Sequence, residues 1–186
     1  MNQGNEQSGE MHPVRGVLAG LAGGLIAAFV MNEFQAALSK ATEALKEQKS
    51  SPQQAQHQDG EQQDGREKPD DATQKAADRI AAAVTGVHLT KQQKEIYGPM
   101  VHYGMGAVSG IVYGVAAECL KSARIGFGTL FGTVLFVLAD EIAVPALGLS
   151  QSPTEQPATA QITPWLSHLV YGLTVESVCW TSRKIF

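Results

Sequence analysis

Hydrophobic and polar residues are grouped in long blocks along the chain, and four of the apolar blocks are long enough for membrane-spanning helices. They cover residues 14–34, 99–120, 125–149 and 164–182. Each is near or above the roughly 17–25 residues that a helix needs to cross the hydrocarbon core of a bilayer. None has the broad polar face of a soluble amphipathic helix. We therefore predict an all-α protein built as a bundle of four transmembrane helices.

Glycine recurs on one face of the first two predicted helices. The glycines are four residues apart in both: Gly16, Gly20 and Gly24, then Gly106, Gly110 and Gly114. In water each would cost up to ~1 kcal/mol relative to alanine, whereas in lipid a glycine face lets two helices approach closely. The spacing favours a membrane protein over the alternative, a soluble bundle of unusually apolar helices. Such faces could also contact a second copy of the chain or another membrane protein.

The polar stretch 35–98 is predicted to be an extramembrane loop in three parts. Residues 35–48 look helical and extend the first helix, whereas 50–68 is rich in Gln, Asp and Glu and is expected to be disordered. Residues 69–86 indicate a short amphipathic helix that ends at Gly86. This helix either lies on the membrane surface or packs on the bundle.

The basic residues predict the orientation of the helices. They flank the first helix, the turn between the second and third, and the end of the fourth: Arg15, Lys121, Arg124, Arg183 and Lys184. The positive-inside rule then places both termini in the cytoplasm. Residues 1–13 would be a disordered cytoplasmic N-terminus, and 14–186 a single multi-pass membrane domain with the lipid bilayer as its partner.

Charge and motifs exclude several classes of protein. A net charge of −4 argues against a nucleic-acid-binding protein, which needs a basic stripe. Cys119 and Cys179 lack the spacing of a zinc site, and we expect no structural disulfide. The chain has no phosphate-binding loop, GxSxG elbow or HExxH motif. We expect neither a cofactor nor enzymatic activity.

The predicted helices also suggest an internal repeat. The first and third share one pattern, and the second and fourth share another: Gly20-x3-Gly24-x7-Asn32-Glu33 with Gly128-x3-Gly132-x7-Asp140-Glu141, and Val112-Tyr113-Gly114-x3-Glu118 with Val170-Tyr171-Gly172-x3-Glu176. One interpretation is a duplicated helical hairpin; the other is chance similarity between glycine-rich apolar segments.

Polar residues from all four predicted helices fall at one depth, roughly 22–28 Å from the inner boundary at about 1.5 Å rise per residue. This layer comprises Asn32, Glu33, His102, Tyr103, Asp140, Glu141 and His168. A second set lies nearer the inner face: Tyr113, Glu118, Tyr171 and Glu176. A charged carboxylate in lipid costs at least ~2.5–3.5 kcal/mol, so such groups normally face inward and are paired or protonated. We expect Glu141 to face inward, since the repeat matches it with Glu33.

Three interpretations of the layer remain open. His102, His168, Glu33 and Glu141 could form a cluster that exchanges protons, because histidine titrates near pH 6.5 and desolvated carboxylates can titrate well above pH 4. The same four groups could bind a transition metal in a membrane enzyme, although no ExxH spacing supports this. Alternatively, the layer is a set of interhelical hydrogen bonds and ion pairs that fix the register of the helices. The glycine faces and the long loop suggest a different function, that of a structural or assembly subunit of a larger membrane complex.

Several of these stretches resemble small bacterial inner-membrane proteins of the YagU-like type. They are the stretch from Gly98 to Gly104 (GPMVHYG), Tyr113-Gly114-x3-Glu118, Asp140-Glu141-x3-Pro145, and the stretch from Ser167 to Gly172 (SHLVYG) followed by Glu176. The resemblance covers roughly half of the chain. It implies a location in the bacterial inner membrane and a part in acid or envelope stress, and it supplies no catalytic residues.

Overall fold

The computed structural model describes residues 13–49 and 69–185, and this part of the chain consists of helices and the turns between them, without a strand. The predicted disordered stretches 1–13 and 50–68 lie outside the described residues, except for Pro13, where the first helix begins. The longer helices are α1 (Pro13–Lys49), α3 (Ala72–Thr85), α4 (Lys91–Cys119), α5 (Thr129–Phe136) and α7 (Ile162–Ile185). The shorter elements are η1 (Lys121–Arg124), the π-helix η2 (Val137–Ala143), α6 (Val144–Ala146), η3 (Pro153–Glu155) and η4 (Ala158–Gln161).

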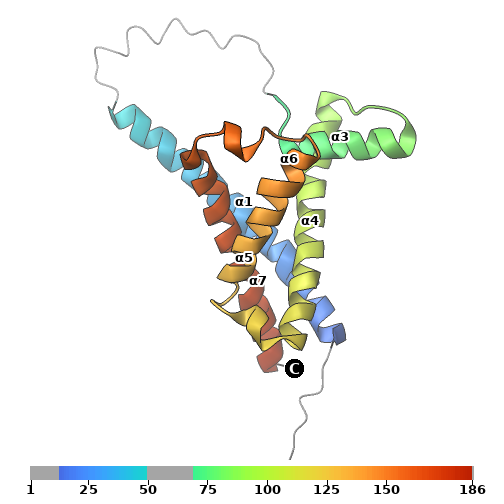
Figure 1. Ribbon diagram of the computed structural model, residues 1–186, viewed down its shortest axis with the longest axis vertical. Helices are drawn as coiled ribbons and strands as arrows, with labels where there is room; N and C mark the ends of the chain where they lie inside the picture. Colours follow the sequence, from blue (N-terminus) through green and yellow to red (C-terminus); the bar gives the residue numbers. More distant parts are fainter. Residues whose placement is uncertain (1–12, 50–68, 186) are drawn as a thin grey trace, which may run out of the picture.

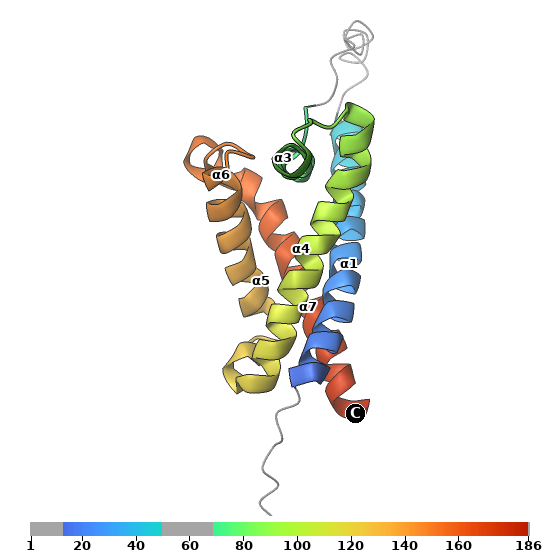
Figure 2. The same ribbon diagram turned by 90° about the vertical axis from the view of Figure 1, so that its right-hand side faces the viewer.

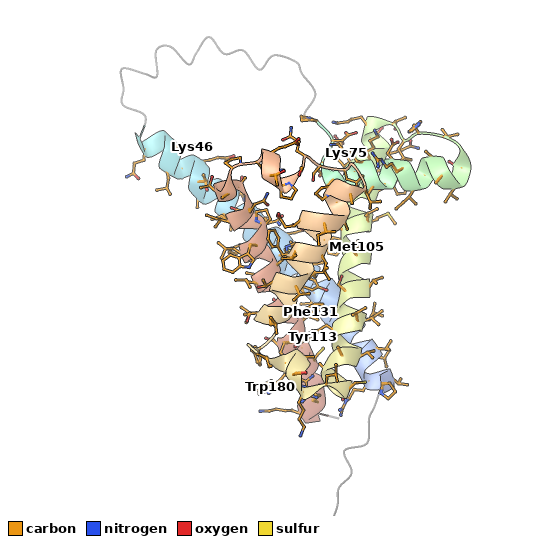
Figure 3. All side chains as sticks on the ribbon, in the orientation of Figure 1. Lys46, Lys75, Met105, Tyr113, Phe131 and Trp180 are labelled. Carbon is orange, nitrogen blue, oxygen red and sulfur yellow. The ribbon has the colours of Figure 1, made fainter. Side chains whose placement is uncertain are left out.

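Helices α1, α4, α5 and α7 run lengthwise side by side, with α4 and α7 packed on α1 and α5 packed on α7 (Figures 1 and 2). The core lies where these helices meet and includes Tyr113, Ala117, Tyr171 and Val175. Tyr113 and Phe131 stack in the middle of the bundle with ring centroids 4.7 Å apart (Figure 3). The start of α1, the η1 turn and the C-terminus lie at one end, and α3 crosses the other end.

Three helices have the length and hydropathy to cross a membrane: Pro13–Lys46 of α1, the whole of α4, and Thr129–Ala146. Helix α7 is 24 residues long but is not among them. It carries polar residues that lower its hydropathy, and Ser167, His168 and Glu176 are buried inside the bundle. The chain is therefore an all-helical protein with three candidate membrane-spanning helices.

The glycine faces of α1 and α4 contact each other directly. Each glycine of one helix faces the backbone of the other, in the antiparallel pairs Gly16–Gly114, Gly20–Gly110 and Gly24–Gly106. A Cβ atom added at Gly110 would lie 2.5 Å from the Cα atom of Gly24. Helices α5 and α7 repeat this arrangement, because Gly128 faces Gly172 and Gly132 faces the carbonyl of His168. The glycine faces are therefore packed against other helices of the same chain.

Helix α4 begins at Lys91, well before the expected start at residue 99. The signal is a capping box: the Thr90 side chain accepts a bond from the Gln93 backbone, and the Gln93 side chain accepts one from the Thr90 N–H. The first turns of α4 are polar and continue the membrane-spanning helix beyond its apolar part. Pro99 is tolerated within this helix.

Helix α3 packs on this polar start of α4. Asp70 is 2.9 Å from Lys94 Nζ and 3.3 Å from Lys91 Nζ, and Asp78 accepts bonds from the Leu89 N–H and from His88. The hydrogen bond from Lys94 lowers the pKa of Asp70, and the hydrogen bond from His88 lowers the pKa of Asp78. Of the two placements left open for this helix, the structure has α3 packed on the bundle.

The same helix holds the end of α6. Lys75 Nζ donates to the Leu149 carbonyl at 3.0 Å, and Arg79 donates to the carbonyls of Leu147 and Gly148. Carbonyls at a helix C-terminus lack intrahelical partners, and cations there are favourable. Figure 3 shows Lys75 at this meeting point of α3 and α6. Charged side chains therefore attach the α3 helix both to α4 and to the end of α6.

Candidate functional site

Three ionisable side chains from three different helical elements meet in the half of the bundle nearer α3. His102 comes from α4, Asp140 from the π-helix η2, and His168 from α7. The His168 Nδ1 atom lies 3.6 Å from Asp140 Oδ2, and His102 lies on α4, which packs beside α7. We call these three residues the His–Asp cluster.

His168 is oriented by its own helix. Its Nδ1 lies 3.0 Å from the Pro164 carbonyl oxygen, which can only accept a hydrogen bond, so Nδ1 carries a proton. In the neutral ring Nε2 is then the basic nitrogen. The residue is buried, at 7% exposure, and its ring packs against Phe136 with centroids 5.7 Å apart.

His102 brings an unpaired nitrogen to the cluster. Its Nε2 is buried and has no hydrogen-bond partner among the described residues. The ring lies edge-on to Tyr103, with centroids 5.8 Å apart, and the Tyr103 hydroxyl accepts a bond from Asn32 Nδ2 at 3.4 Å. A buried polar atom without a partner is uncommon in native proteins and is often explained by function or by a water molecule. Asn32 and Tyr103 are therefore placed beside His102 only.

Asp140, rather than the expected Glu141, is the carboxylate beside His168. The two residues lie in the π-helix, where a widened turn changes the directions of side chains from those of an α-helix. Pro145 gives the reason, because a proline in a helix lacks an N–H and its ring clashes with the carbonyl four residues earlier, here that of Glu141. The Val144 N–H bonds to Ala139 O instead. π-Helical turns occur frequently at functional sites.

The other two carboxylates of the predicted layer do not join the cluster. Glu33 is exposed on α1, and Glu141 is half-buried without a hydrogen bond or ion pair to another described residue. Within residues 13–49 and 69–185, no group of three or more His, Cys, Asp or Glu side chains is placed to hold a metal ion. The four proposed metal ligands are thus not brought together.

The second predicted set lies towards the opposite end of the bundle and is tied by ion pairs. Arg183 Nη2 is 2.7 Å from Glu176 Oε1, and the Tyr113 hydroxyl donates to Glu176 Oε2 at 2.8 Å. Arg15 and Glu118 form a second pair at 2.7 Å, joining α1 to α4. We call these two contacts the inner ion pairs.

Tyr171 completes this second set. Its hydroxyl donates to the Gly106 carbonyl at 2.6 Å, so it joins α7 to the glycine face of α4. The sequence signal for these pairs is the position of Arg15 and Arg183 at helix ends, within reach of Glu118 and Glu176.

Three helices long and apolar enough to cross a membrane suggest a helical membrane protein. The chain belongs to the family described as "Protein of unknown function (DUF1440)", whose model matches residues 67–177. The match covers α3, α4, α5 and most of α7, including the His–Asp cluster. No curated protein and no solved structure gives a significant match.

Proposed function

We propose that this chain is a multi-pass membrane protein whose His–Asp cluster takes up and releases a proton, so that its state is linked to the pH on the α3 side. The observation that carries the proposal is the 3.6 Å approach of His168 to Asp140, together with the buried Nε2 of His102, which is unpartnered within the described part of the chain. Histidine is the side chain whose ordinary titration falls between about pH 5 and pH 8. Intramembrane ionisable residues commonly mark proton relays.

The geometry supports proton exchange better than a purely structural contact. The 3.6 Å separation of His168 Nδ1 from Asp140 Oδ2 is longer than a good hydrogen bond, and Nδ1 is already bonded to Pro164. His102 Nε2 has no partner among the described residues. The cluster therefore keeps capacity to bind protons, in contrast to the inner ion pairs, whose carboxylates are held at 2.7 Å by arginine.

The proposal includes α7 as a fourth membrane-spanning helix, with both termini in the cytoplasm of a bacterium. Helix α7 runs along α1 and α5, and it buries Ser167, His168 and Glu176 away from the lipid (Figure 2). Arg15, Arg124 and Arg183 lie at the end that also holds the C-terminus, as the positive-inside rule requires for that orientation. The resemblance to YagU-like proteins supports a role in acid or envelope stress.

Survival of a bacterial reporter strain in strong acid tests this function. We expect Asp140→Asn to reduce survival to the level of a strain lacking the protein, because the cluster loses its only carboxylate. Glu141→Gln is the matched control, since it neutralises the neighbouring residue of the same π-helix and should leave survival unchanged. Protein levels are compared by immunoblot. Equal survival of both variants and the wild type would refute the proposed role.

A further inference from the structure

An apolar groove lies between α3 and α4, on the side of α4 that faces away from the rest of the bundle. Ile80 and Val84 line it from α3, and Tyr97, Met100 and Val101 line it from α4. Its volume is about 590 Å³, within the range of pockets that hold small molecules. The groove is separate from the His–Asp cluster, and none of the cluster residues lines it.

Several residues of the groove are exposed although they are large and apolar. Ile80 is 56% exposed, Val84 79% and Met100 61%. Packing of α3 on α4 buries Ala77 but leaves these three uncovered. The charged residues Lys75 and Arg79 point instead toward the end of α6. Helix α3 is therefore amphipathic. Its apolar face is turned toward α4, but the side chains of α4 do not cover that face.

The groove continues into the surface by which α4 would contact lipid. Met105, Val108 and Val112 follow Met100 along α4 and are each more than half exposed. At its other end the groove is lined by the polar residues His88 and Gln93. It thus runs from an apolar, lipid-facing surface to a polar rim beyond the apolar part of α4. A molecule that fits must be apolar at one end and polar at the other.

We propose that this groove binds one membrane phospholipid from the leaflet on the α3 side, with an acyl chain along Ile80, Val84 and Met100 and the headgroup near His88 and Gln93. Burial of apolar surface is favourable, as it is when amphipathic helices insert at membrane surfaces. The proposal rests on membrane insertion of α4 and does not depend on proton exchange by the His–Asp cluster.

Quenching of single tryptophans in proteoliposomes tests this. Trp165 and Trp180 are replaced by Phe, and one tryptophan is introduced as Val84→Trp, Ala83→Trp or Val112→Trp in the full chain. All three positions are exposed, which favours folding of the variants. The liposomes contain phosphatidylcholine with brominated acyl chains, or the unbrominated lipid as reference. We expect severalfold stronger quenching for Val84→Trp, in the groove, than for Ala83→Trp, on another face of α3.

Three other outcomes would overturn the proposal, and each points to a different cause. Strong quenching of Val112→Trp with equal, weak quenching of Val84→Trp and Ala83→Trp would show that α4 is inserted and that the groove is empty of lipid. Val84→Trp fluorescence that depends on the ratio of protein to lipid, without bromine quenching, would assign the groove to a second copy of the chain. Absence of quenching for Val112→Trp would overturn the membrane placement itself.

A second variant checks the groove without tryptophan. Ile80→Glu places a charge against the acyl chain, so native mass spectrometry of the detergent-solubilised protein should show loss of one retained phospholipid. Ala83→Glu is the matched control on the same helix and should retain it. Retention of phospholipid by both variants would contradict the proposed position of the acyl chain.

Discussion

Gly110→Ala should destabilise the protein by about 1–3 kcal/mol, the usual cost of inserting a methyl group where there is no space. The added Cβ would lie 2.5 Å from Gly24 Cα and 2.8 Å from Gly24 N. These are backbone atoms and cannot rotate away as the end of a side chain can. Helices α1 and α4 must therefore separate along their whole glycine face, which also weakens the contacts between Gly16 and Gly114 and between Gly24 and Gly106.

Gly104→Ala is the matched control for this substitution, because Gly104 lies on the same helix and an added Cβ would meet nothing within 4 Å. The two variants are compared by unfolding in detergent micelles, followed by the helical circular dichroism signal. Gly104→Ala should be neutral or slightly stabilising, since alanine favours helix over glycine by about 1 kcal/mol. Equal stability of the two variants would show that the glycine face does not join α1 to α4.

Glu176→Gln should cost about 3–5 kcal/mol of stability, as is typical when one partner of a buried ion pair is removed. The Glu176 side chain is 3% exposed, and that of Arg183 is 12% exposed. The substitution keeps the shape of the side chain and an acceptor for the Tyr113 hydroxyl, but it leaves the guanidinium without its counter-charge. Detergent unfolding again measures the loss.

Two further variants identify the source of this loss. Adding Arg183→Met to Glu176→Gln should recover much of the stability, because the uncompensated charge is then removed. Glu33→Gln neutralises an exposed carboxylate on α1 and should change the free energy of unfolding little. A double variant as unstable as the sum of its single variants would contradict the pairing of Glu176 with Arg183.

The depth of each polar residue was predictable from the sequence, and with it much of the candidate site. Counting along the helices from the basic ends placed Asn32 level with Tyr103 and Asp140 level with His168, and both pairs are in contact. The glycine spacing likewise indicated closely packed faces. Both predictions depend on rise per residue, a property of the backbone that the sequence does not alter in a regular helix.

The direction of a side chain around its helix was not predictable in the same way. Glu33 and Glu141 fall at the right depth, but the structure turns Glu33 outward, and Asp140 takes the position expected for Glu141. The π-helix caused the second error, and Pro145 was its signal in the sequence. The attachment of α3 to the end of α6 joins charged residues to backbone carbonyls, which carry no trace in the sequence.

Nitrogen NMR of the histidine side chains in proteoliposomes tests the central claim most directly, because it reports the protonation of each ring. His88, which is exposed outside the apolar part of α4, is an internal reference, and signals are assigned by single His→Gln substitutions. The account predicts that at least one of His102 and His168 changes protonation between about pH 5 and pH 8, and that Asp140→Asn alters that titration while Glu141→Gln does not. Rings of His102 and His168 that both keep one protonation state across this range would contradict it.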